Sequence, residues 1–228
     1  MEAALRVGLM VPANNTTMER ELVAWLPAGT SCMTLGIPRG KGALTLPDIP
    51  AYVARATSLA RAFAEEPVDI VIYGCTAAGI LAGPSRDAGI AASLSRITGK
   101  PAVTTASAMV DALYHAGARE VALVTPYQDL VNERLKAFLA ATGIQVRKLS
   151  SFGAASTDEL AMISEDQVVG LARETMDDDC DALFIACSQL PTYAILGGLA
   201  QEFGRPVLSS IQATAWRARQ ELGGFLLM

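Results

Sequence analysis

The stretch VDIVIYGCT at residues 68–76 is matched half a chain later by CDALFIACS at residues 180–188. Each stretch is a continuous apolar run that ends in a small residue, a cysteine and a hydroxyl residue. Such a run is typical of a strand buried on both faces of a parallel sheet. Ligands of these sheets bind beyond the carboxyl ends of the strands, so Cys75 and Cys187 are predicted to lie at the mouth of a site.

Two further pairs of stretches repeat in the same order. RVGLMVP at residues 6–12 is matched by REVALVTP at residues 119–126, and GKPAVTT at residues 99–105 is matched by GRPVLSS at residues 204–210. The first of these pairs is offset by 114 positions, the cysteine stretches by 112 and the last pair by 105. We infer an internal duplication of a strand-helix unit of about 110 residues.

Apolar strands alternate with helical patterns along the whole chain. Strands are predicted at residues 5–11, 30–36, 68–74, 101–104, 119–125, 145–150, 181–186 and 206–209. Helices are predicted at residues 16–26, 50–66, 78–97, 106–116, 128–142, 158–177, 190–202 and 211–220, with Asp48 and Ser156 at two of the helix starts.

This alternation indicates an α/β fold of two similar doubly wound lobes, each with a mostly parallel four-stranded sheet. The repeats relate the lobes by a pseudo-two-fold duplication. We expect the first lobe at residues 1–105 plus 210–228 and the second at residues 106–209. The active site is expected between them.

The composition narrows the class of protein. The net charge of −5, without a basic cluster, argues against a nucleic-acid surface. No apolar stretch approaches the roughly 18 residues of a membrane span. The strand predicted close to the N-terminus leaves no room for a signal peptide, so we expect a cytoplasmic protein whose four cysteines are free thiols. Hydrophobic residues reach 51%, which favours a homo-oligomer.

The residue types favour chemistry by cysteine without a metal or a cofactor. The single histidine, His115, falls on a predicted helix, where it is expected to pack, and no Cys/His cluster has the spacing of metal ligands. The pKa of a thiol falls beside a helix N-terminus, so Cys75 and Cys187 are expected to be activated. One thiolate can then attack carbon or remove a proton, and the opposite thiol can return one. The alternative is that both are small buried hydrophobes.

Polar side chains follow the other predicted strand ends. Asn15 comes after the first strand, and Tyr127 stands at the matching place in the second half. Amides and hydroxyls, including those of Thr76 and Ser188, can bind a carboxylate without any arginine. The alternatives are a helix cap for Asn15 and packing between helices for Tyr127.

The segment GIPRGKG at residues 36–42 is the most flexible connection that the sequence suggests. It contains three glycines and a proline in seven residues. We expect either a lid over the mouth of the first lobe or an ordinary surface loop.

Four motifs together resemble the aspartate/glutamate racemase superfamily, and within it the branch that holds maleate cis-trans isomerase and arylmalonate decarboxylase. They are VPANNTTME at residues 11–19, GCT at 74–76, TPY at 125–127 and ACS at 186–188. The resemblance covers almost the whole chain. It implies a cofactor-independent enzyme that acts on a small dicarboxylate or a related acid.

The resemblance also implies roles for single residues. Cys75 would attack the alkene carbon of maleate and form a covalent succinyl-type intermediate, and Cys187 would be its acid/base partner. Asn15 and Tyr127 match residues that hold the substrate carboxylates. The other positions that the resemblance places at the substrate are Pro12, Thr76, Thr157 and Ser188.

The chain departs from the isomerase pattern at two places, one of which is Ala13-Asn14 in place of the usual Ser-Ser. At the other, Ser156 and Thr157 stand where that enzyme has an Asp-Asn pair whose Asn contacts the substrate. The departures suggest a relative of maleate, such as a monoamide or a substituted diacid.

Four functions stay open at this point. The first is cis-trans isomerisation of maleate or a maleate-like diacid to the fumarate form. The second is a two-cysteine racemase of the aspartate, glutamate or hydantoin type. The third is an arylmalonate-type decarboxylase, against which Cys75 counts because the decarboxylase has glycine there. The fourth is a protein that binds a small acid without catalysis.

Overall fold

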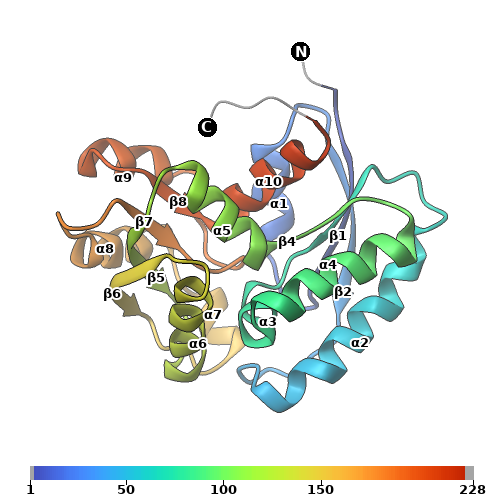
Figure 1. The fold of residues 1–228 in the computed structure, drawn as a ribbon, viewed down its shortest axis with the longest axis horizontal. Coiled ribbons are helices and arrows are strands. Elements are labelled where there is room, and N and C mark those ends of the chain that lie inside the picture. The colour runs from blue at the N-terminus through green and yellow to red at the C-terminus, as the bar shows by residue number, and fades with distance from the viewer. Residues whose placement is uncertain (1–2, 224–228) are drawn as a thin grey trace.

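The computed structural model describes residues 3–223 (Figure 1). Residues 1–2 and 224–228, which the sequence assigns to the first lobe, lie outside the described residues. Within residues 3–223 the strands form two parallel sheets of four strands each, in the orders β2-β1-β3-β4 and β6-β5-β7-β8. Equivalent strands occupy equivalent places, which confirms the predicted α/β fold with its internal duplication.

Each predicted strand is present. The first sheet contains β1 (Arg6–Pro12), β2 (Ser31–Ile37), β3 (Ile70–Tyr73) and β4 (Ala102–Thr104). The second contains β5 (Glu120–Thr125), β6 (Gln145–Ser151), β7 (Ala182–Ile185) and β8 (Val207–Ser209). All residues of β3 and β7 are buried, which explains their continuous apolar sequence. The edge strands β2 and β6 are partly exposed and more polar.

The helices surround and separate the two sheets. They are α1 (Met18–Trp25), α2 (Ile49–Ala60), α3 (Thr76–Ala82), α4 (Pro84–Thr98), α5 (Thr105–His115), α6 (Asp129–Ala140), α7 (Thr157–Ala161), α8 (Glu165–Thr175), α9 (Leu196–Phe203) and α10 (Ser210–Glu221). Short 3₁₀ turns cover Leu46–Asp48 and Arg61–Phe63, so the predicted helix at 50–66 ends as an α-helix at residue 60. No helix in this part of the chain is both long and apolar enough to cross a membrane.

Two long predicted helices are each divided in two. The stretch 78–97 breaks between α3 and α4, because Gly83 has φ 82° and Pro84 starts a new helix. The stretch 158–177 breaks between α7 and α8, because Ser164 caps a new helix by accepting a hydrogen bond from the Gln167 N–H at 3.3 Å. Ser156 caps α7 as predicted, accepting from the Glu159 N–H at 3.2 Å.

The predicted helix at 190–202 begins only at Leu196. The main chain of Thr192 and Tyr193 donates instead to the carboxylate of Glu21, which comes from α1 in the other half. The segment before α9 is thus held by a carboxylate that is distant in sequence.

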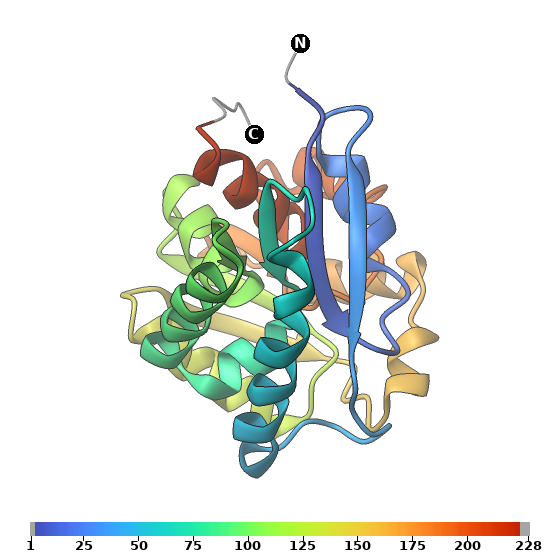
Figure 2. The same ribbon diagram turned by 90° about the vertical axis from the view of Figure 1, so that its right-hand side faces the viewer.

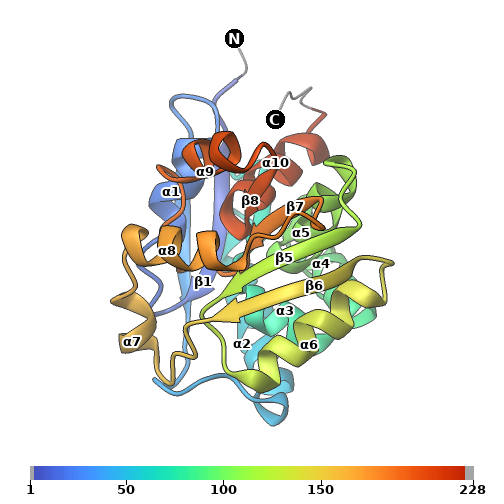
Figure 3. The ribbon, with the colours of Figure 1, turned by 90° about the vertical axis from the view of Figure 1, so that its left-hand side faces the viewer.

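The order of the strands reverses at the same place in both sheets. β1 pairs with both β2 and β3, and β5 pairs with both β6 and β7. Loops that leave neighbouring strands in opposite directions open a crevice at their carboxyl ends. Figure 2 shows the side of the molecule that carries β1 and β2, and Figure 3 shows the side that carries β5 and β6.

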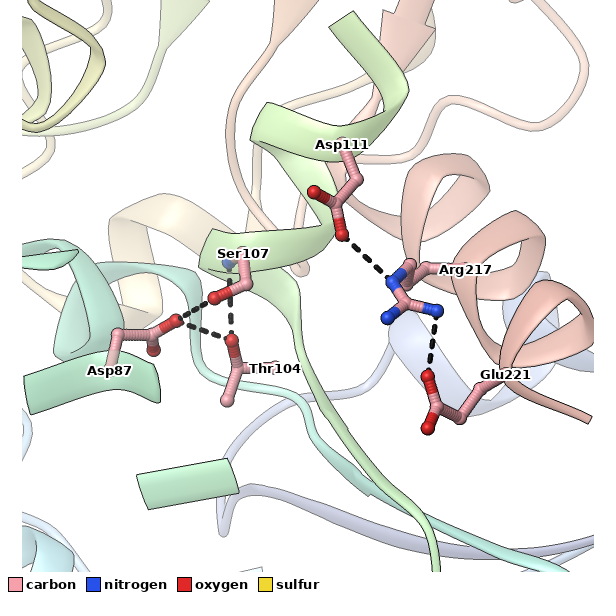
Figure 4. Close-up of polar contacts among 6 residues, drawn as sticks. All are labelled: Asp87, Thr104, Ser107, Asp111, Arg217 and Glu221. Carbon is pink, nitrogen blue, oxygen red and sulfur yellow. Dashed lines mark hydrogen bonds and ion pairs between the residues drawn. The ribbon is translucent and has the colours of Figure 1, made fainter. Parts of the chain in front are cut away.

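The two halves share buried structure. α5 and α10 lie between the sheets and contact both β4 and β8 (Figure 1). Arg217 of α10 pairs with Asp111 of α5 at 2.8 Å (Figure 4). In the same view the buried Asp87 of α4 accepts hydrogen bonds from Thr104 and Ser107, each at 2.5 Å. Burial raises the pKa of the Asp87 carboxyl.

Candidate active site

A cavity lies at the carboxyl ends of β1, β3, β5 and β7, and we name it the thiol cavity. It encloses about 410 Å³, part of which is open to solvent. Every candidate residue lines it: Pro12, Asn15, Cys75, Thr76, Tyr127, Thr157, Cys187 and Ser188. The geometry therefore brings together side chains from both halves of the chain, while their individual roles stay predictions.

The main chain is fixed just before each cysteine. The Gly74 N–H donates to the Met10 carbonyl at 2.7 Å, and the Ala186 N–H makes the matching bond in the second half at 2.8 Å. A Cβ atom on Gly74 would lie 2.5 Å from the sulfur of Met18 and 2.9 Å from the Met10 carbonyl oxygen. The first half therefore needs glycine where the second half accommodates alanine.

Both thiols are held in the neutral form. Burial raises the pKa of Cys75, and it raises the pKa of Cys187 to about 11. Opposing this, Tyr52 favours the thiolate of Cys75, and the Gln189 N–H contacts the Cys187 sulfur at 3.3 Å. The expectation of lowered thiol pKa values is wrong, because desolvation outweighs these contacts. A charge on Cys75 further raises the pKa of Cys187, so ionisation of one thiol disfavours ionisation of the other.

Two hydroxyl groups of the thiol cavity are buried without a hydrogen-bond partner of standard geometry. They belong to Tyr127, beside Cys187, and to Thr76, which follows Cys75. Leaving a buried hydroxyl unpaired costs about 1–3 kcal/mol, so both are suited to donate to a substrate oxygen. Asn132 positions Tyr127 by donating to its carbonyl at 2.8 Å.

Asn15 connects the two halves. Its Oδ1 accepts from the N–H groups of Thr17 and Met18 at 3.1 and 2.9 Å, so it caps the start of α1. Its Nδ2 donates to the Ser188 carbonyl at 3.1 Å, and the Ser188 hydroxyl donates to the Gly74 carbonyl at 2.9 Å. The helix-cap interpretation of Asn15 is thus confirmed, and carboxylate binding by Asn15 stays a prediction.

Five described residues that line the thiol cavity are absent from the candidates drawn from the sequence, and Gln189 and Arg39 are two of them. Gln189 exchanges two hydrogen bonds with Thr16, each at 2.9 Å. Arg39 reaches the thiol cavity from the loop after β2. Its place beyond a strand's carboxyl end is the signal that could have identified it. Arg39 is not among the candidates because amides and hydroxyls were expected to bind the carboxylate without any arginine.

The loop at residues 36–42 lies against the second half rather than free on the surface. The Thr157 N–H donates to the Lys41 carbonyl at 2.9 Å, and Lys41 Nζ pairs with Asp158 at 2.7 Å. Figures 2 and 3 both show this loop beside α7. The loop therefore forms one wall of the thiol cavity.

Neither His115 nor a metal cluster belongs to this site. His115 packs against Trp216, with ring centroids 5.0 Å apart, and it does not line the thiol cavity. Across residues 3–223, no group of three or more His, Cys, Asp or Glu side chains is placed to hold a metal ion. The reactive groups that the geometry brings together are the two thiols.

Comparison with known proteins agrees with this geometry. A family model described as arylmalonate decarboxylase matches residues 7–224. The chain belongs to the arylmalonate decarboxylase family. Maleate isomerase of Nocardia farcinica (strain IFM 10152) is 29% identical over 225 residues, which cover 95% of this chain and 90% of that protein. Arylmalonate decarboxylase of Bordetella bronchiseptica is 28% identical over 187 residues, covering 81% and 78% of the two chains.

A solved structure extends the likeness to three dimensions. It is the Nocardia farcinica maleate cis-trans isomerase, in a cysteine-to-serine mutant with a covalently bound succinylcysteine intermediate. Its TM-score is 0.90 at 26% identity, covering 97% of this chain and 94% of that chain. These findings confirm the branch of the superfamily that the four sequence motifs predict.

Proposed function

We propose that this member of the arylmalonate decarboxylase family is a cofactor-independent isomerase, which converts maleate or a maleate-like diacid to the fumarate form. The observation that carries the proposal is the presence of two buried thiols, Cys75 and Cys187, in one cavity. The covalent succinylcysteine in the Nocardia farcinica isomerase supports the same chemistry. A decarboxylase of the arylmalonate type has no need of Cys75.

The reaction would use one thiolate and one thiol. The Cys75 sulfur adds to one alkene carbon, and the π electrons move to the other carbon, where the adjacent carboxylate stabilises them. The thiol of Cys187 then gives its proton to that carbon. The former double bond is now single and rotates. Cys187 takes a proton back from the same carbon, the carbon–sulfur bond breaks, and fumarate leaves with Cys75 restored.

The raised pKa of Cys187 fits this scheme, whereas that of Cys75 must be overcome when substrate binds. Cys187 must carry a proton when Cys75 attacks, and a pKa of about 11 keeps it protonated at neutral pH. The unpartnered hydroxyls of Tyr127 and Thr76 would donate to a substrate carboxylate as charge moves onto it.

The direct test is proton NMR of the purified protein with maleate in deuterated buffer. Replacement of the maleate vinyl signal by that of fumarate is the expected result. Unchanged maleate would overturn the proposal for maleate itself. Exchange of the α-proton of an amino acid would then favour the two-cysteine racemase, which would use the same pair of thiols.

Variants of the two cysteines test the covalent mechanism. Cys75→Ser should lose most turnover, because a hydroxyl is a far weaker nucleophile at neutral pH. Cys187→Ser should lose roughly 10²–10⁴-fold through loss of proton transfer. Intact-protein mass spectrometry of Cys187→Ser should show an adduct with the mass of one maleic acid.

The matched control is Cys32→Ser in β2, because Cys32 does not line the thiol cavity. It should keep its turnover and form no additional adduct. Undiminished turnover of Cys75→Ser would rule out covalent attack by this residue.

A further inference from the structure

The thiol cavity has a single charged side chain among the described residues that line it, and this is Arg39. The side chain is half-buried. Arg39 also lines a neighbouring cavity, which shares Ala77, Tyr127, Thr157 and Leu160 with the thiol cavity and continues over apolar residues such as Leu44. Arg39 therefore stands at the junction of the two spaces.

No acidic side chain lines either cavity, as far as the described residues show, and the charge of Arg39 acts on Asp48, which lies outside both cavities. The guanidinium donates to the carbonyl oxygens of Gly40, at 3.2 Å, and of Gly42. Among residues 3–223 it forms no ion pair with a carboxylate within 4.0 Å. A guanidinium has five N–H donors, so donors are left for an anion.

The position of Arg39 is fixed from both sides. Its bonds to Gly40 and Gly42 hold the side chain against its own loop, and Arg55 Nε donates to the Pro38 carbonyl at 3.0 Å. The hydrogen bond from the Thr157 N–H to the Lys41 carbonyl then holds the main chain of the loop against the start of α7, while the exposed ion pair of Lys41 with Asp158 adds little. A cation held in this way can orient a carboxylate at little further entropic cost.

The charge also reaches the reacting sulfur. Burial dominates the pKa of Cys75 and raises it, while the positive charge of Arg39 acts in the opposite direction. A dicarboxylate bound between the thiols would bring two negative charges into a mostly buried site. Hydroxyls and amides alone would leave both of them without an opposite charge, which is unfavourable.

We infer that Arg39 binds the second carboxylate of the substrate and makes this enzyme selective for a dianionic diacid over the corresponding monoamide. This deepens the proposed function and rests on it. The chemical role lost where Ser156 and Thr157 stand, an amide that contacts substrate, is supplied from the adjoining loop by a guanidinium. The monoamide suggested by the sequence is accordingly the poorer substrate.

Steady-state kinetics of Arg39→Gln on maleate and on its monoamide test the inference. The KM for maleate should rise by roughly tenfold or more, because a charge-assisted pair is lost. The kcat for maleate and the KM for the monoamide should change much less. Arg39→Lys should recover part of the affinity for maleate, since it keeps the charge but loses the planar fork. Equal losses on both substrates would overturn the inference.

Lys41→Gln is the matched control. It removes the same charge from the same loop, at a side chain that pairs with Asp158 and does not line the thiol cavity. Its KM for maleate should match the wild type. A rise as large as that of Arg39→Gln would show a general effect of loop charge and would also overturn the inference.

A binding measurement separates this inference from the proposed reaction. Succinate should protect the cavity thiols from iodoacetamide in the wild type, and about tenfold more should be needed in Arg39→Gln. Protection by the monoamide of succinate should be the same in both proteins. If protection depends on Arg39 while maleate is not turned over, the anion site stands and the proposed reaction fails. If succinate protects neither protein, or both equally, the anion site fails.

Discussion

The chemistry of Cys75 and Cys187 depends on where their protons lie. Burial removes water from both sulfurs and raises both pKa values, with Cys187 reaching about 11. The thiolate is the nucleophilic form, and its fraction therefore still grows above the usual thiol pKa of about 8.5. At neutral pH the substrate meets two thiols, and binding must supply the conditions for one to ionise.

Alkylation rates should show these raised pKa values directly. The rates of Cys75 and Cys187 with iodoacetamide should still be rising at about pH 10, where glutathione and the urea-unfolded protein have levelled off. Peptide mass spectrometry after timed quenching measures each cysteine separately. A plateau at the same pH as glutathione would contradict the dominance of burial.

The sequence places the cysteines better than it describes their surroundings. The places of Cys75 and Cys187 follow from the strand ends alone, because each strand and its cysteine lie within a single stretch of sequence. The pKa shift of Cys75 depends on desolvation and on Tyr52 of α2, and neither can be read from the residues around the cysteine. Arg39 was missed for a similar reason, since its loop reaches the thiol cavity through contact with α7.

The break between α3 and α4 depends on a single glycine. Gly83 has φ 82° and ψ 162°, a region that is nearly closed to residues with a side chain. Gly83→Ala should therefore lower the free energy of unfolding by roughly 1–3 kcal/mol. Urea denaturation followed by circular dichroism measures the change through the midpoint.

Gly89, which lies inside α4, is the matched control position. A Cβ atom there meets nothing within 4 Å, so Gly89→Ala should stabilise the protein by about 0.5–1 kcal/mol. If the two variants shifted stability in the same direction, the backbone of Gly83 would not explain the break.

Strands were predicted more accurately than helices because a strand buried on both faces has a continuous apolar run, which is visible in the local sequence. β3 and β7 are apolar throughout, and their limits follow from composition. The segment before α9 has no such mark, because its N–H groups bind Glu21, which lies 171 positions from Thr192 along the chain. The divisions at Gly83-Pro84 and Ser164 are local signals that the helical periodicity concealed.

Glu21 makes a buried polar contact between the two halves of the molecule. Its buried carboxylate accepts hydrogen bonds from the N–H of Thr192 at 2.9 Å, the hydroxyl of Thr192 at 2.9 Å and the N–H of Tyr193 at 3.1 Å. Glu21→Gln places an NH₂ group against these donors and should cost roughly 2–3 kcal/mol of unfolding free energy.

Glu19→Gln, on the exposed side of the same helix, should change stability by less than about 0.5 kcal/mol. Urea unfolding of the two variants under the same conditions provides the comparison. A Glu21→Gln protein as stable as Glu19→Gln would mean that this contact contributes little to joining the halves.

The division into lobes at residues 1–105 plus 210–228 and 106–209 stays a prediction. Its least expected part, the return of the last helix to the first lobe, has a packing counterpart. Ile211 and Ala215 of α10 share a buried cluster with Val7, Leu9 and Ile70 of the first sheet. Another buried cluster runs from Met10 in the first sheet to Leu208 in the second.

The place of α10 has a consequence for the order in which the protein can be completed during synthesis. A ribosome delivers β1 and β3 long before residues 210–221, yet one face of these strands is covered by that late helix. Until α10 emerges, Val7, Leu9 and Ile70 remain without part of their cover. During synthesis the first half of the chain therefore exposes apolar surface, to which chaperones can bind, until α10 has emerged.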